Sequence, residues 1–261
     1  MRYLRIYLNF MRFAASRAMQ FRAELGFRIV MDIAFYAIFL GFYKVIYSHT
    51  PILGGWNEQQ AMIFVSGFMV VDALQMTFFA DMYHSFQVLY RQGALDHYLT
   101  KPISSWFFVG FRYINFASLA NVLISGSILS WAILRYEEPL HWWAIAIYLL
   151  LLLSSAFLYF LVIFSLLMCV FWWENSDAMM AIYFEGVNFA SRPHHIFKGF
   201  VRGLLMTVVP FSVFASIPAQ ALFEQVGWLS VLHVFAVILL FLGINLFLWN
   251  RGLRRYASSL G

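Results

Sequence analysis

The residues best suited to chemistry are polar side chains inside long apolar stretches. Asp72 lies near the middle of one stretch, with Gln75 on the same helical face, and Asp32 lies about one turn into an earlier one. A carboxylate inside a bilayer is costly, so it usually handles a substrate or a proton, or is satisfied by a neighbouring helix. No charged partner occurs at a matching depth elsewhere, which favours a hydrogen-bonded or protonated carboxyl over a proton relay.

A second polar group follows helical spacing. Its members are Asn115, Ser118, Asn121 and Ser125, whose spacing places them on one face of a helix. This face predicts either a wall of a polar pathway or an interhelical contact, because small polar residues allow close approach and hydrogen bonding. We favour the contact, and keep a pathway lined by these four residues with Asp72 and Gln75 as the alternative.

Common catalytic signatures are absent from the sequence. A P-loop needs a lysine directly after a glycine, whereas the three lysines, Lys44, Lys101 and Lys198, follow Tyr43, Thr100 and Phe197. Neither G-x-S-x-G nor H-E-x-x-H occurs, and the adjacent His194 and His195 would not share one helical face. We therefore expect no catalytic residue, no metal and no cofactor in this chain.

The composition indicates which elements must position these residues. Hydrophobic residues make up 63% of the 261 residues and charged residues 11%, against about 45–50% and about 25% in soluble domains. The single cysteine, Cys169, excludes a disulfide scaffold. We expect one all-α, polytopic membrane domain over residues 1–261. Its six spans, each about the length that crosses a bilayer, are predicted at 27–47, 59–82, 113–134, 142–171, 203–223 and 228–249.

The basic residues predict the orientation of these spans. With both termini in the cytoplasm, only Lys44 and Arg135 of the 17 lysines and arginines lie outside, as the positive-inside rule requires. The basic residues form no continuous patch, so nucleic acid is not an expected partner.

Two further segments have distinct patterns. Residues 1–22 are too polar to span, but Arg2, Arg5 and Arg12 fall opposite an apolar face, which predicts an interfacial helix anchored on inner-leaflet lipid. Pro210 and Pro218 interrupt the fifth stretch, so we expect a re-entrant segment on the outer side over 210–226.

The polar connection 83–112 carries the functional argument. Residues 83–92 are amphipathic and should extend the second span into the cytoplasm, Gly93 should break that helix, and 94–99 should form a second short helix before Lys101-Pro102. Leu95 and Leu99, four residues apart, should present one apolar face to a partner.

The run Gly93-Ala94-Leu95-Asp96, followed by Tyr98-Leu99 and Lys101-Pro102-Ile103, resembles the "G-x-L-D-x-x-L-x-[KR]-P" segment of bacterial ABC transporter permeases of the type-two exporter class. The basic N-terminal helix, the six spans and the proline-broken stretch after Val209 are similar to that family as well, so the likeness covers essentially the whole chain.

This resemblance implies a permease subunit of an ATP-driven exporter in the bacterial inner membrane. Residues 83–106 would contain a coupling helix that docks on a separate ATPase subunit, which would hold ATP and Mg. A second permease chain, identical or paralogous, would complete the transporter. The implied contact residues are Gly93, Leu95, Asp96, Tyr98, Leu99, Lys101 and Pro102.

A stand-alone secondary transporter or channel is the alternative function. That class predicts an internal repeat and paired charges near the membrane midplane. No convincing repeat relates residues 1–130 to 131–261, which favours the ABC permease.

Overall fold

The computed structural model describes residues 2–20, 22–53, 55–173, 214–223 and 228–259, with the single residues Ala181 and Glu185. Within these ranges the regular elements are helices, as the composition predicts. Five of them are long and apolar enough to cross a membrane: Leu25–His49, Glu58–Phe78, Phe116–Leu134, Trp142–Phe171 and Val231–Tyr256. The protein is therefore a multi-pass membrane protein.

These five spans match five of the six predicted stretches. The remaining stretch, 203–223, lies outside the described residues apart from 214–223, as does most of the predicted re-entrant segment 210–226. The described part includes α11 (Ser216–Phe223), which has Pro218 in its first turn, where a missing N–H removes no intrahelical bond.

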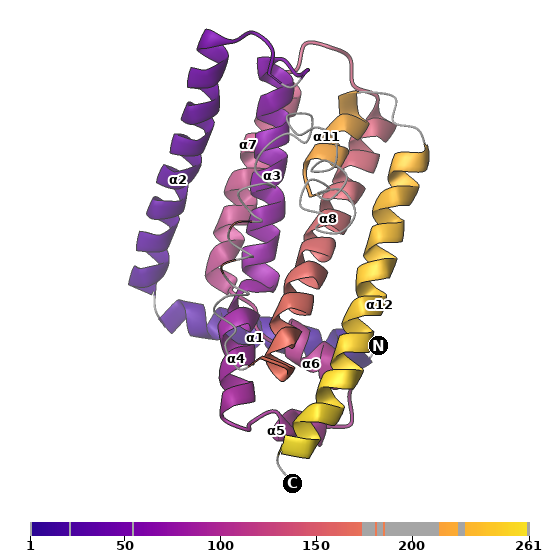
Figure 1. Ribbon diagram of the computed structural model, residues 1–261. Coiled ribbons are helices and arrows are strands. Elements are labelled where there is room, and N and C mark those ends of the chain that lie inside the picture. Colours follow the sequence, from indigo (N-terminus) through magenta and orange to yellow (C-terminus); the bar gives the residue numbers. More distant parts are fainter. Residues whose placement is uncertain are drawn as a thin grey trace.

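The long helices run side by side (Figure 1). They are α2 (Arg22–His49), α3 (Glu58–Phe78), α7 (Leu119–Leu134), α8 (Trp142–Met168) and α12 (Trp228–Ser259). Of these helix pairs, α3 with α7 and α8 with α12 pack most extensively, and α3 also contacts α8. The helices α2 and α12 stand at opposite edges of the bundle and expose most of their apolar residues.

The start of α3 is fixed by its sequence. Asn57 is the N-cap: its side chain accepts a hydrogen bond from the Gln60 backbone N–H at 2.9 Å, and the Gln60 side chain accepts one from the Asn57 N–H at 3.1 Å. This capping box satisfies two of the amide groups that a helix start leaves without partners.

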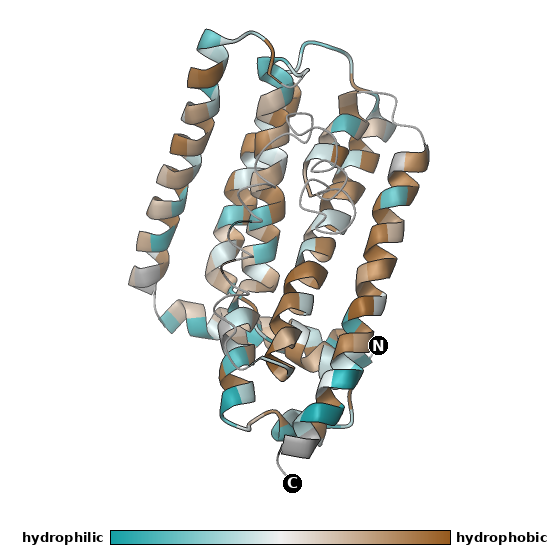
Figure 2. Cartoon of the chain, in the orientation of Figure 1, coloured by the Kyte–Doolittle hydropathy of each residue, from teal (hydrophilic) through white to brown (hydrophobic). Residues whose placement is uncertain are grey.

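The N-terminal helix α1 (Arg2–Gln20) crosses the end of the bundle at which both chain termini lie (Figure 1). Two aromatic contacts hold it there: Tyr3 with Phe107 at 4.9 Å and Phe10 with Phe108 at 5.2 Å between ring centroids. Figure 2 shows apolar residues along the bundle and hydrophilic residues gathered at its ends, on α1 and on the last turns of α12. The predicted amphipathic helix is confirmed, and its place on the inner leaflet stays a prediction.

Candidate functional site

The predicted coupling segment consists of three short helices at the same end of the bundle as α1. They are α4 (Ala80–Arg91), α5 (Asp96–Leu99) and α6 (Ser105–Phe111). The second span ends at Phe78 rather than at 82, because the backbone of Phe79 leaves the helical conformation and its ring stacks on Phe160 at 4.4 Å. The helix break at Gly93 is confirmed.

Gly93 ends α4 by a specific hydrogen-bond pattern. Its φ of +67° lies in the left-handed region, its N–H bonds the Tyr90 carbonyl at 3.2 Å, and the Ala94 N–H bonds the Leu89 carbonyl at 3.0 Å. These two bonds define a Schellman motif, in which glycine is favoured because it has no Cβ. The motif turns the chain sharply from α4 towards α5.

The inner face of α4 is fixed to the bundle by aromatic rings. Phe86 is fully buried and contacts Phe164, Phe171 and Trp249 at centroid distances of 5.9, 5.8 and 6.2 Å. Tyr90 contacts Tyr256 of α12 at 5.7 Å. A displacement of α4 would therefore be transmitted to α8 and α12.

The inner face of α5 packs against α6. Tyr98 is buried, its ring lies 5.2 Å from that of Phe108, and its hydroxyl accepts a hydrogen bond from Arg112. The Lys101 ammonium lies 4.7 Å from the centroid of the Phe108 ring and 5.4 Å from that of Tyr98. These cation–π contacts fix the turn after α5.

Leu95 and Leu99 do not share an exposed face, and the expectation that they would is wrong. Leu95 is 0% exposed and Leu99 is 36% exposed. The physical reason is that α12 continues to Ser259, beyond the predicted end at 249, which brings its Tyr256 beside the backbone of Leu95 and Asp96. The inner side of α5 is therefore part of the hydrophobic core of its own chain.

The outward surface of α5 is formed by Asp96, His97, Leu99 and Thr100, and Pro102 is exposed just beyond it. The predicted contact residues thus divide into exposed ones (Asp96, Leu99 and Pro102) and inner anchors (Leu95, Tyr98 and Lys101). His97 and Thr100 were not predicted as contact residues, although their positions between and directly after the two leucines could have indicated them.

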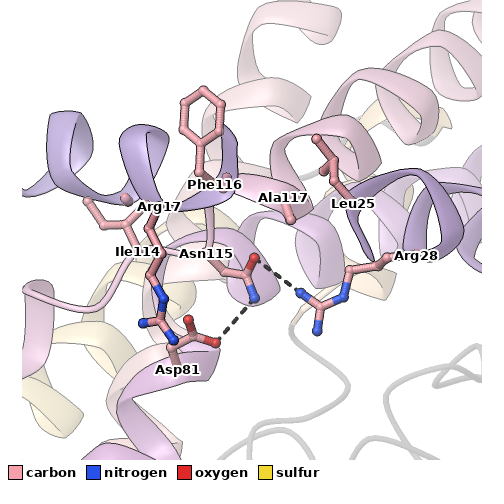
Figure 3. Close-up of a pocket in the computed structure, with 10 residues that line it drawn as sticks. Arg17, Leu25, Arg28, Asp81, Ile114, Asn115, Phe116 and Ala117 are labelled. Carbon is pink, nitrogen blue, oxygen red and sulfur yellow. Dashed lines mark hydrogen bonds between the residues drawn. The ribbon is translucent and has the colours of Figure 1, made fainter. Parts of the chain in front are cut away.

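Asn115 joins four elements where α1, α2 and α4 meet the start of the third span (Figure 3). Its backbone N–H donates to the Thr77 carbonyl at 2.8 Å, which satisfies one of the carbonyls left free at the end of α3. Its side-chain oxygen accepts from Arg28 of α2 at 3.2 Å, and its amide donates to Asp81 of α4 at 3.2 Å. The same oxygen caps η1 (Phe116–Ser118) by accepting from the Ser118 N–H. We call this arrangement the Asn115 junction.

Two cavities flank the Asn115 junction. One, of about 350 Å³, is lined by Arg17, Arg28, Asp81 and Asn115 among others. The second, of about 470 Å³, is lined by Arg17, Asp81, Lys101, Arg112 and Tyr113, together with Phe10 and Phe13 of α1. Burial raises the pKa of Tyr113 to about 12, so this phenol is protonated at neutral pH.

The comparisons with known proteins agree with this architecture. The family described as ABC-2 family transporter protein matches residues 33–259. The chain belongs to the ABC-2 transporter family. Comparisons with curated proteins and with solved structures found no match. The matched range begins after α1 and contains the whole α4–α5–α6 segment of this ABC-2 permease.

The predicted polar face of the third span, which we call the polar stripe (Asn115, Ser118, Asn121 and Ser125), lies largely inside the bundle of the ABC-2 chain. Ser118, Asn121 and Ser125 are buried, and α3 is the principal neighbour of their helix. The Ser125 hydroxyl donates to the Asn121 carbonyl at 2.6 Å. Burial beside α3 favours the interhelical contact, and the pathway role stays a prediction.

The polar groups of α3 are partly satisfied within the same chain. Gln75 is fully buried and donates to the Tyr83 hydroxyl of α4, so it links the second span to the coupling segment. Asp72, one turn earlier, is half-buried, and Asn115, which the stripe included, instead forms the junction described above.

Proposed function

We propose that this ABC-2 permease couples to a separate ATPase through the outward surface of α5, as the membrane subunit of an ATP-driven exporter. The observation that carries the proposal is the way α5 is held. It lies between α4 and α6 at one end of the bundle (Figure 1). Its Leu95 and Tyr98 are buried, and its outward residues are exposed, namely Asp96, His97, Leu99 and Thr100.

Coupling requires contacts that differ between the nucleotide states of the ATPase. A rigid connection between the contact surface and the spans then transmits the change in these contacts to the spans. Phe86 connects α4 to α8 and α12, and Asn115 connects α4 to α2, α3 and η1. A force on α5 therefore reaches each of these spans through side chains in direct contact.

The remaining features of the proposal follow from the same assignment. ATP and Mg belong to the ATPase subunit, and this chain contributes no catalytic residue. Two permease chains, identical or paralogous, form the translocation pathway in a bacterial inner membrane. The described chain leaves α8 at the end that carries α5 and resumes with α11 at the other end, which supports six crossings with both termini in the cytoplasm.

The test uses Leu99→Asp in the full chain, co-expressed with an ABC ATPase that co-purifies with the wild-type chain. A buried leucine side chain contributes about 1.5–3 kcal/mol, so the charge should weaken ATPase binding at least about tenfold. Co-purification and ATP turnover in reconstituted vesicles are the measurements. Leu134→Asp is the matched control, because Leu134 is 85% exposed at the opposite end of its span.

ATPase retention and turnover should fall with Leu99→Asp and persist with Leu134→Asp. Unchanged retention and turnover in a folded Leu99→Asp chain would refute coupling through α5 and favour a transporter or channel that works alone. Leu95→Asp is unsuitable for this test, because it places an unpaired charge in the core.

A further inference from the structure

The two cavities beside the Asn115 junction form one basic groove between α1 and the start of the third span. They share a wall made of Ala14, Arg17, Asp81 and Ile114. Four cations line the groove: Arg17, Arg28, Lys101 and Arg112. Asp81 is the one carboxylate among the residues that line these two cavities, and Asn115 already donates to it.

Three of the four cations of the groove are oriented by neutral partners. Arg112 donates to the Tyr98 hydroxyl and stacks 5.4 Å from Phe108, and Lys101 lies over the same ring. Arg28 donates to the Asn115 side-chain oxygen. Within the described part of the chain, no ion pair neutralises any of these three side chains. Aligned cations of this kind bind phosphate by charge-assisted hydrogen bonds.

The α1 side of the groove also carries apolar side chains, one turn before Arg17. Ile6, Phe10 and Phe13 of α1 line it, and Phe13 is 76% exposed. In Figure 2, α1 lies where the apolar part of the bundle gives way to hydrophilic residues, which is the depth of lipid headgroups when the spans cross a bilayer. Cations and exposed aromatic rings in one groove suit a ligand with an anionic head and an apolar chain.

We propose that this groove binds a phosphate group at the membrane surface, in particular that of an anionic amphiphile. The phosphate lies between Arg17, Lys101 and Arg112, and the chain follows Phe10 and Phe13. This binding site does not depend on the proposed ATPase coupling.

The experiment measures lipid retention by the purified full chain in detergent, using native mass spectrometry. Phosphatidylglycerol and phosphatidylcholine are the probes, because they share the phosphate and differ in net charge. We expect the wild-type chain to retain phosphatidylglycerol preferentially. Each arginine lost from the groove should lower retention about tenfold, the value of one charge-assisted hydrogen bond.

Two double variants separate the groove from the general basic charge of this end of the chain. Arg17→Gln with Arg112→Gln removes two groove cations. Arg91→Gln with Arg254→Gln removes the same charge from exposed positions on α4 and α12 that do not line either cavity. The first variant should lose the lipid and the second should keep it. Lys101→Gln, whose side chain contacts only rings in the groove, is the substitute if the Arg112 variant fails to fold.

A competition arm identifies the source of the phosphate. Displacement of the lipid by millimolar inorganic phosphate would support a site for the phosphate group itself, whichever molecule carries it. Retention against inorganic phosphate would support the membrane lipid as the source. Equal retention of both lipids, equal losses in the two double variants, or displacement by a glutamate-rich peptide alone would overturn the proposal.

Discussion

At the scale of single residues, Gly93 decides the direction of the coupling segment. Its left-handed backbone lets the Ala94 N–H reach the Leu89 carbonyl, and a side chain there carries a steric penalty. Nothing about the contacts of α5 with α6 requires glycine. The requirement for glycine is therefore confined to the turn between α4 and α5.

Gly93→Ala should lower the free energy of unfolding by about 1–2 kcal/mol, because alanine resists φ near +67°. Thermal unfolding in detergent, followed by tryptophan fluorescence, measures the change. Gly126→Ala is the control: it lies within α7 with nothing inside 4 Å of a built Cβ, so helix propensity should leave stability equal or raised. Equal losses in both variants would contradict the role of the turn.

The residues of α5 show where the sequence argument stops. The motif and the glycine break correctly predicted a short helix between two connections. Spacing alone could not show which leucine faces the protein core, because a four-residue helix has no long stripe and the covering residue, Tyr256, lies far along the chain. Side-chain burial in such a segment is decided by tertiary contacts.

At the scale of elements, α1 combines two attachments. Aromatic rings dock it on α6, and the Tyr3 hydroxyl accepts from the Ser104 N–H at 3.4 Å. Its arginines Arg2, Arg5 and Arg12 are exposed, and therefore free to meet lipid headgroups. The docking and the membrane association can be tested separately.

Replacing Arg2, Arg5 and Arg12 together with Glu should weaken the association of α1 with anionic membranes by about 1 kcal/mol for each lost arginine. A spin label at position 9, in a chain reconstituted into anionic vesicles, reports depth and water contact. The triple Lys variant keeps the charge and should behave as wild type. A label that is deep in hydrocarbon or in bulk water in the wild-type background would reject the interfacial placement.

The ends of the helices are harder to predict from the sequence than the spans themselves. Apolar runs located five spans well, because burial in a bilayer demands a fixed length. The end of α3 at Phe78 depends instead on contacts with distant segments, namely Phe79 with Phe160 and the Asn115 N–H with the Thr77 carbonyl. Beyond residue 249, α12 likewise meets the distant start of α5 through Tyr256. Hydropathy contains no information about these partners.

At the scale of the whole molecule, both chain termini, α1 and α5 gather at one end, while Arg135 lies just after α7 at the other. The positive-inside rule predicts that the first end is cytoplasmic. The polar stripe and the Asn115 junction were one pattern in the sequence, but the fold separates them: Asn121 and Ser125 are buried in the bundle, whereas Asn115 faces the basic groove.

Cysteine labelling tests this orientation, because Cys169 is the single native cysteine. In a Cys169→Ser background, Arg135→Cys should react with a membrane-impermeant maleimide in intact cells. His97→Cys should react only after the membrane is permeabilised. The reverse pattern would place α5 outside and exclude contact with a cytoplasmic ATPase.

The docking of α1 also has a consequence for biosynthesis. Tyr3 meets Ser104 across a separation of 101 residues, so α1 is synthesised well before its partner surface on α6. At translation rates of about 5–20 residues per second, this delay is on the order of 5–20 s. During that time the membrane surface can hold the amphipathic α1. We therefore expect α1 to lie on lipid first and to dock on α6 late in folding.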